Sequence, residues 1–207
     1  MEYCMSRLIV NQIQGDAASK QIQIPTGHRL TGGTGSIVPA GSVVQCQNIR
    51  VTARSSQSIT QNSANASATN ITGMTLNVTP VFANSKMIIQ ARWCGEFGAV
   101  SSGGWNNMFL IQRDNTPVSQ PPRLGGLTAG DMPSSLGYYA QDDSSTMENC
   151  MWDTVDFPNT TSQVTYTAAI YNGFTGYTLY NNRNVNGAEN SSYETGSSTI
   201  VVWEIAQ

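Results

Sequence analysis

The residues that could support acid–base catalysis are few and scattered. His28 is the single histidine, so a Ser-His-Asp triad would have to use it, and no GxSxG motif marks a nucleophilic serine. Two carboxylates about 5–9 Å apart could hydrolyse a glycan. The candidate acids are Asp131, Asp142, Asp143, Glu148, Asp153 and Asp156. Solvation of loops and turns explains these acids more simply than catalysis does, so we expect that the protein is not an enzyme.

The sequence also lacks the usual patterns of metal and phosphate sites. Asp142-Asp143 could join a Ca²⁺ site, but no EF-hand spacing supports one. The Gly-rich TGGTG lacks the Lys-Ser/Thr of a phosphate-binding loop, and we interpret it as a hinge. The four cysteines form no CxxC and no ligand spacing, which favours four small buried hydrophobic residues. They are Cys4, Cys46, Cys94 and Cys150. We expect that the protein needs no metal and no cofactor.

Three aromatic residues in or beside loops could bind sugars. They are Trp105, Tyr138 and Tyr139. Aromatic rings stack on sugar rings, and the many Asn and Gln side chains could hydrogen-bond sugar hydroxyls. The simpler interpretation is that these aromatic residues anchor the loops or pack at subunit contacts.

Composition narrows the class of protein. The chain has 207 residues, of which 39% are hydrophobic and only 11% charged, with a formal net charge of −3. The apolar residues are grouped in alternating runs, which indicates an ordered β-protein with polar turns. The basic residues are spread out, which argues against nucleic acid as a partner. No run approaches the roughly 18 apolar residues that span a bilayer, and MEYCMSRLIVNQIQG is a poor signal peptide, so we expect no membrane contact.

The stretch SKMIIQARWCGEF, Ser85–Phe97, has the strongest strand pattern. Its large apolar side chains share one parity and its polar ones the other, with Ile88 and Cys94 as exceptions, as in a half-buried strand. The apolar set is Met87, Ile89, Ala91, Trp93 and Phe97. A strand this long needs an opposing sheet to cover it. We therefore expect the central strand of a β-sandwich, with Trp93 buried between two sheets.

Further runs predict the rest of the sandwich. The expected strands are Ser42–Arg54, Thr72–Thr79, Trp105–Arg113, Thr146–Pro158, Ser162–Tyr171, Tyr177–Tyr180 and Ser198–Ala206, the last with Thr199, Val201, Trp203 and Ile205 on one face. The turn-rich VSSGG predicts a hairpin between Ser85–Phe97 and Trp105–Arg113. About eight antiparallel strands with long excursions between them favour an all-β, jelly-roll-like sandwich over residues 43–207. An immunoglobulin-like sandwich is the alternative, but its Cys…Trp…Cys pattern is missing.

Residues 1–42 differ from this domain. SRLIVNQIQ and KQIQIPTG are short extended runs, and the first is apolar on both faces. So few apolar side chains cannot form a core of their own, so the segment should pack against another chain. Folding back onto its own domain is the alternative. We expect a stem for oligomerisation and docking, formed by Leu8, Ile9, Val10, Ile13, Ile22 and Ile24.

Two groups of motifs resemble known virion proteins. SRLIVNQIQ followed by KQIQIPTGHRL is similar to the opening of short fibre and capsid decoration proteins of tailed bacteriophages, notably those of marine cyanobacteria. VFANSKMIIQA, then DFP and the closing STIVVWEI, resembles the β-sandwich head domains of the same group. The resemblance covers most of the chain, and the order of several weak motifs carries it.

The resemblance implies a structural protein on the surface of a phage virion. Its partners would be further copies of itself, as a trimer, and other virion proteins of the capsid or tail; it would be made in the bacterial cytoplasm. The chain has no extended shaft, which favours a head fibre or decoration protein over a long tail fibre. Two rivals remain: a fibre tip that binds host surface polysaccharide, and a glycan depolymerase.

Overall fold

The computed structural model describes residues 26, 38–60, 68–98, 107–118, 134–135, 146–172, 176–186 and 194–207. The chain divides into two units, Met1–Ile37 and Val38–Gln207. Only Thr26 of the first unit is described, so the stem over residues 1–42 stays a prediction. Its proposed docking residues all lie outside the described part: Leu8, Ile9, Val10, Ile13, Ile22 and Ile24.

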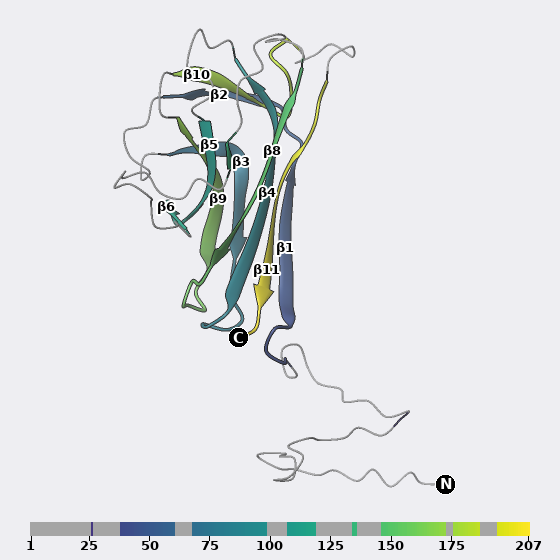
Figure 1. Cartoon of the computed structure of the whole chain (residues 1–207), viewed down its shortest axis with the longest axis vertical. Coiled ribbons are helices and arrows are strands. Elements are labelled where there is room, and N and C mark those ends of the chain that lie inside the picture. Colours follow the sequence, from purple (N-terminus) through teal and green to yellow (C-terminus); the bar gives the residue numbers. More distant parts are fainter. Residues whose placement is uncertain are drawn as a thin grey trace. The chain divides into compact units, whose positions relative to one another are not determined.

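The regular structure of the described residues is β-strand throughout, arranged as two antiparallel sheets (Figure 1). Sheet A has the order β1 (Val43–Val51), β11 (Ser198–Ile205), β4 (Lys86–Phe97), β10 (Tyr177–Asn181) and β2 (Ser55–Ile59), and β8 (Glu148–Asp156) pairs with the other edge of β4. Sheet B has the order β3 (Thr69–Val78), β9 (Val164–Asn172), β5 (Asn107–Arg113) and β6 (Thr116–Pro117), with β7 (Ser134–Ser135) also paired to β5. The predicted all-β antiparallel sandwich is confirmed.

Eight strands of this sandwich pair in a nested order. Taken along the chain, these are β1, β3, β4, β5, β6, β8, β9 and β11. The first pairs with the last, the second with the seventh, the third with the sixth and the fourth with the fifth. A long hairpin of strand pairs wound around one core gives this order. This order is the one expected for the predicted jelly-roll-like sandwich, while the jelly-roll form itself stays a prediction.

Strand β4 is the centre of sheet A, as its alternation predicted. Its residues 87–92 pair with β11 on one edge and with β8 on the other, and its last residues pair with β10. The inward side chains of Met87, Ile89, Trp93 and Phe97 are 0% exposed. The prediction that Trp93 is buried between the sheets is therefore confirmed.

An aromatic cluster joins the two sheets at the core. The Trp93 ring centroid lies 5.3 Å from that of Phe97 in the same strand and 5.3 Å from that of Phe109 in sheet B. The Phe109 ring in turn lies 5.0 Å from Trp152 of β8. The indole Nε1 of Trp93 donates to Oδ1 of Asn181 at 2.8 Å. This buried polar group is thus satisfied, and the cluster ties β4, β5, β8 and β10 together.

The predicted hairpin between Ser85–Phe97 and Trp105–Arg113 is wrong. β5 lies in sheet B, where it pairs with β9, whereas β4 lies in sheet A. Turn residues signal that a chain reverses, but they do not decide which sheet the next strand joins. Phe109 and Ile111 belong to the core that β4 also lines, and they can reach it only from the opposing sheet.

Candidate functional site

The outward side of sheet A is the candidate interaction surface. Strands β8, β4, β11 and β1 lie side by side here (Figure 1), and residues opposite each other in antiparallel strands point to the same face. The registers give three rows of side chains: Arg50, Thr199, Arg92 and Met151; then Asn48, Val201, Gln90 and Asp153; then Cys46, Trp203, Ile88 and Val155. We call these residues the outer face.

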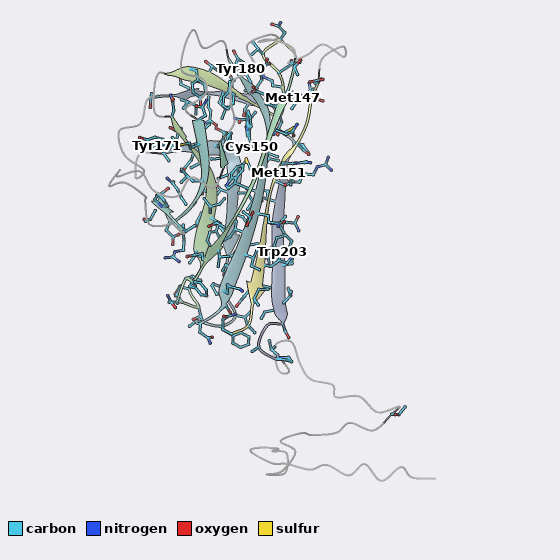
Figure 2. The ribbon with its side chains drawn as sticks, in the orientation of Figure 1. Met147, Cys150, Met151, Tyr171, Tyr180 and Trp203 are labelled. Atoms are coloured by element: carbon cyan, nitrogen blue, oxygen red, sulfur yellow. The ribbon has the colours of Figure 1, made fainter. Side chains whose placement is uncertain are left out.

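Burial shows which side of each strand faces solvent. On β8, Met151 is 73% exposed while Cys150 and Trp152 on either side of it are buried. On β11, Ile200 and Val202 are the buried residues. Figure 2 labels Met151 and Trp203, which represent the outer face on β8 and β11. The predicted common face of β11 therefore exists, but it is the outer side of the sandwich: Thr199, Val201, Trp203 and Ile205.

The third row of the outer face is apolar across all four strands. Cys46 and Val155 are exposed, and Trp203 and Ile88 are half-buried. A single exposed apolar side chain is ordinary on a folded protein. An unbroken row contributed by four strands is a feature of surfaces that contact another protein.

Two shallow hollows lie on the outer face around Gln90. The larger has a volume of about 280 Å³ and is lined by Gln90, Ala91, Arg92, Met151, Thr199 and Val201. The smaller has a volume of about 120 Å³ and is lined by Gln90, Ala91, Met151, Trp152 and Asp153. Their walls combine hydrogen-bonding groups with aliphatic and thioether surface. Such a mixture suits a small ligand with one polar and one apolar side.

Two arginines of the first row have no acidic partner among the described residues. Arg92 donates from Nη2 to the carbonyl oxygen of Ser197 at 3.0 Å, and Arg50 donates from Nε to Oγ of the same serine at 3.2 Å. The Nε of Arg92 is buried and finds no hydrogen-bond acceptor. Within the described ranges the ion pair that forms is Arg113 with Asp156, on other strands. The first row thus carries two guanidinium groups, and the same region contains the carboxylate of Glu194, which acts on the pKa of Cys94 in the opposite direction to Arg92.

A buried network fixes the serine that anchors both arginines. Oγ of Ser198 donates to Oδ1 of Asn182 at 2.7 Å and accepts from the backbone N of Cys94 at 3.1 Å. The backbone N of Asn182 donates to the Cys94 carbonyl at 2.8 Å. Ser198 begins β11, so the network sets the position of Ser197 immediately before it. The two guanidinium groups are thus anchored to a serine that directly precedes this buried network.

The acids weighed as catalytic candidates do not meet in the described residues. Glu148 and Asp156 lie at opposite ends of the nine-residue strand β8, which is a separation of about 26 Å. Asp153 points to the opposite face of the same strand. Asp156 forms an ion pair with Arg113 at 2.7 Å, so it has a structural role. The other candidates lie outside the described residues: Asp131, Asp142 and Asp143.

The three aromatic residues predicted to bind sugars also lie outside the described part of the chain: Trp105, Tyr138 and Tyr139. The same holds for His28, the single histidine. Sugar binding by the loop aromatics therefore stays a prediction. The hollow around Gln90 was not found from the sequence. The one sequence feature that points to the hollow is that Gln90 and Arg92 are polar residues on the solvent-facing side of the predicted central strand.

The cysteine prediction is partly wrong. Cys94 and Cys150 are buried as expected, but Cys46 is exposed, and Cys4 lies outside the described residues. Cys46 is exposed because its parity on β1 places it opposite Trp203 on the outer face. Burial raises the pKa of the Cys94 thiol, which keeps this side chain protonated and unreactive near neutral pH.

The described residues contain no group of three or more His, Cys, Asp or Glu side chains placed to hold a metal ion. The same residues include no helix with the length and hydropathy needed to cross a bilayer.

No protein-family model matches the chain, and no curated protein matches it. The function must therefore be argued from the surface that the fold presents.

Proposed function

We propose that this protein is a non-enzymatic structural protein of a bacteriophage virion, an oligomeric decoration protein or short fibre on the particle surface. The observation that carries the proposal is the apolar third row of the outer face. The sandwich already has a continuous core between its sheets, so this row is not needed for its own folding. The row is therefore available for contact with another protein.

The partner that we assign to this row is a second copy of the same chain. The sequence resemblance to short fibres and decoration proteins implies a trimer. In a closed ring every copy uses the same surfaces to contact its neighbours. The apolar row of each copy is then covered by a neighbouring copy, and none stays exposed to bind further chains. The low content of charged residues, 11%, agrees with extensive contact between copies. Docking to the capsid or tail falls to the stem of residues 1–42.

Deleting residues 1–40 should leave a folded β-domain that associates more weakly and no longer attaches to particles. The reason is that the described core lies wholly within Val38–Gln207, whereas the apolar stem runs lie before it. Sedimentation of full-length and truncated protein measures association. Co-purification with particles that lack the native copy measures attachment.

A control variant separates the stem from the outer face. Val155→Lys in full-length protein places a charge in the apolar row at a site that is 37% exposed, so the fold should survive while the oligomer weakens. If the truncated protein keeps both the oligomer and the attachment, the stem is not the docking element. Hydrolysis of host glycan by the purified protein would contradict a non-enzymatic role.

A further inference from the structure

Arg92 has hydrogen-bonding capacity that the described fold does not use. Its Nη2 is held by Ser197 at 3.0 Å, while its buried Nε has no acceptor. A guanidinium group offers several donors in a fixed planar array, and a carboxylate can take two of them at once. The residue beside Arg92 on β8 is the neutral Met151. The carboxylate of Glu194, a described acid in the same region, accepts a hydrogen bond from the backbone N of Met147 at 2.7 Å.

The hollow next to Arg92 has the size and lining for one sugar ring. Its volume is about 280 Å³. Gln90 and Thr199 supply hydrogen-bonding groups for ring hydroxyls, and Met151 and Val201 supply apolar surface for the C–H face of a sugar. The hollow is shallow, so a ligand would remain partly in water.

We infer that this hollow binds an acidic sugar, a uronic acid in its simplest form, with the sugar carboxylate paired to Arg92. Arg50 shares the Ser197 anchor and adds a second positive charge to the same row. The nearest acidic residue of the outer face, Asp153, lies in the second row, opposite Gln90. The inference does not rest on the proposed virion role, because the hollow is lined by the first and second rows of the outer face and the proposed contact between copies uses the third.

One weak site of this kind should bind free glucuronate with a dissociation constant on the order of 1 mM, because a small, partly solvated ligand makes few contacts. Glucose lacks the carboxylate, so it should bind about tenfold more weakly or worse. Acetate lacks the ring and should also bind more weakly. Titrations of the full chain with each compound, followed by the NMR shifts of the Val201 methyl groups, measure all three.

Position 151 provides a matched pair of variants. Met151 is 73% exposed and lies directly opposite Arg92, at a Cβ separation of about 5 Å. Met151→Glu places a carboxylate where it can occupy the Arg92 guanidinium, so glucuronate binding should fall about tenfold. Met151→Gln has the same shape without the charge and should bind glucuronate like the unmodified protein. Arg92→Gln should lose binding as Met151→Glu does.

Four results would overturn the inference. They are the absence of any saturable shift with glucuronate, equal binding of glucose, equal binding of acetate, and equal behaviour of Met151→Glu and Met151→Gln. Melting temperatures of the two Met151 variants check the fold, and both should match the unmodified protein because the side chain is on the surface. If Met151→Glu did not fold, the comparison of Arg92→Gln with Met151→Gln would decide.

Discussion

Replacing Trp93 with alanine is expected to lower the free energy of unfolding by about 3–5 kcal/mol, the range for removing a large aromatic side chain from a core. Trp93 is 0% exposed and contacts aromatic rings from both sheets. The change also leaves Oδ1 of Asn181 without its indole donor. A loss of this size is a large part of the stability of a typical domain, so the variant should be unfolded or close to it at 37 °C.

A second tryptophan supplies the control for this experiment. Trp203 is the same residue type, but it lies half-buried on the outer face, so Trp203→Ala should cost about 1 kcal/mol or less in the monomeric state. Trp93→Phe keeps most of the ring volume but loses the hydrogen bond to Asn181, and it should fall in between. Urea unfolding followed by far-UV circular dichroism measures all three. Equal losses for Trp93→Ala and Trp203→Ala would contradict the role of Trp93 in the core.

Alternation was enough to predict the strands that have one face in the core and one in water. Strand β8 alternates without exception between buried and exposed side chains, and β4 does so over most of its length. In such strands the two faces differ in polarity because their surroundings differ. The sequence therefore predicts both the presence of such a strand and which of its faces is buried, whereas its ends are set less closely: β8 covers Glu148–Asp156 within the expected Thr146–Pro158.

On a strand with apolar residues on both faces, alternation predicts which residues share a face but not which face lies in the core. On β11 the outer set includes Val201 and Trp203, while the inner set includes Ile200, Val202 and Glu204. Judged by hydrophobicity alone, the outer set of side chains would be at least as suitable as the inner set for facing the core. Which face of β11 lies inward depends on its pairing with β1 and β4 and on the buried hydrogen-bond donors that surround Glu204. None of these contacts is local in sequence.

The outer-face hollow could not be predicted for a similar reason. Arg92 was correctly placed on the exposed parity of its strand. Its neighbours Thr199 and Met151 come from strands far away in the chain, and only the registers between β11, β4 and β8 bring them beside it. From the sequence, the loop aromatics are the more obvious candidates, because loops often carry function. A site formed on the face of a sheet by residues from several strands has no motif of neighbouring residues in the sequence.

Glu204 is the inner-face residue that sequence reasoning missed altogether. It is 0% exposed, and a buried carboxylate is costly unless several donors surround it. Its carboxylate accepts from the backbone N of Val81 at 2.8 Å and of Phe82 at 3.0 Å, and from Oγ of Ser85 at 2.6 Å. Gln45 of β1 also donates to it. The group thus ties the last strand to β1 and to the connection between β3 and β4, where the chain passes from sheet B to sheet A.

These donors also set the titration of the group. Burial alone would raise the pKa of Glu204, but the hydrogen bonds from Ser85, Gln45, Val81 and Phe82 outweigh it and hold the pKa below the ordinary value of 4.5. A carboxylate whose pKa is lowered by folding stabilises the folded state above its ordinary pKa. That stabilisation is lost as the pH falls from about 4.5 through the folded-state pKa. Part of the acid sensitivity of this protein should therefore come from Glu204.

Glu204→Gln is expected to lower the free energy of unfolding at pH 7 by about 3 kcal/mol, because the amide NH₂ then faces groups that are themselves donors. The difference between the unmodified protein and the variant should shrink below pH 4.5, where protonation removes the same interactions from the unmodified protein. Asp153→Asn, at an exposed carboxylate of the outer face, is the matched control and should change the free energy of unfolding at pH 7 by no more than about 0.5 kcal/mol. Urea unfolding at several pH values between 7 and 3 gives the free energy of unfolding and its dependence on pH. A difference for Glu204→Gln that stays constant over this range would show that the charge of Glu204 is not what holds the connection in place.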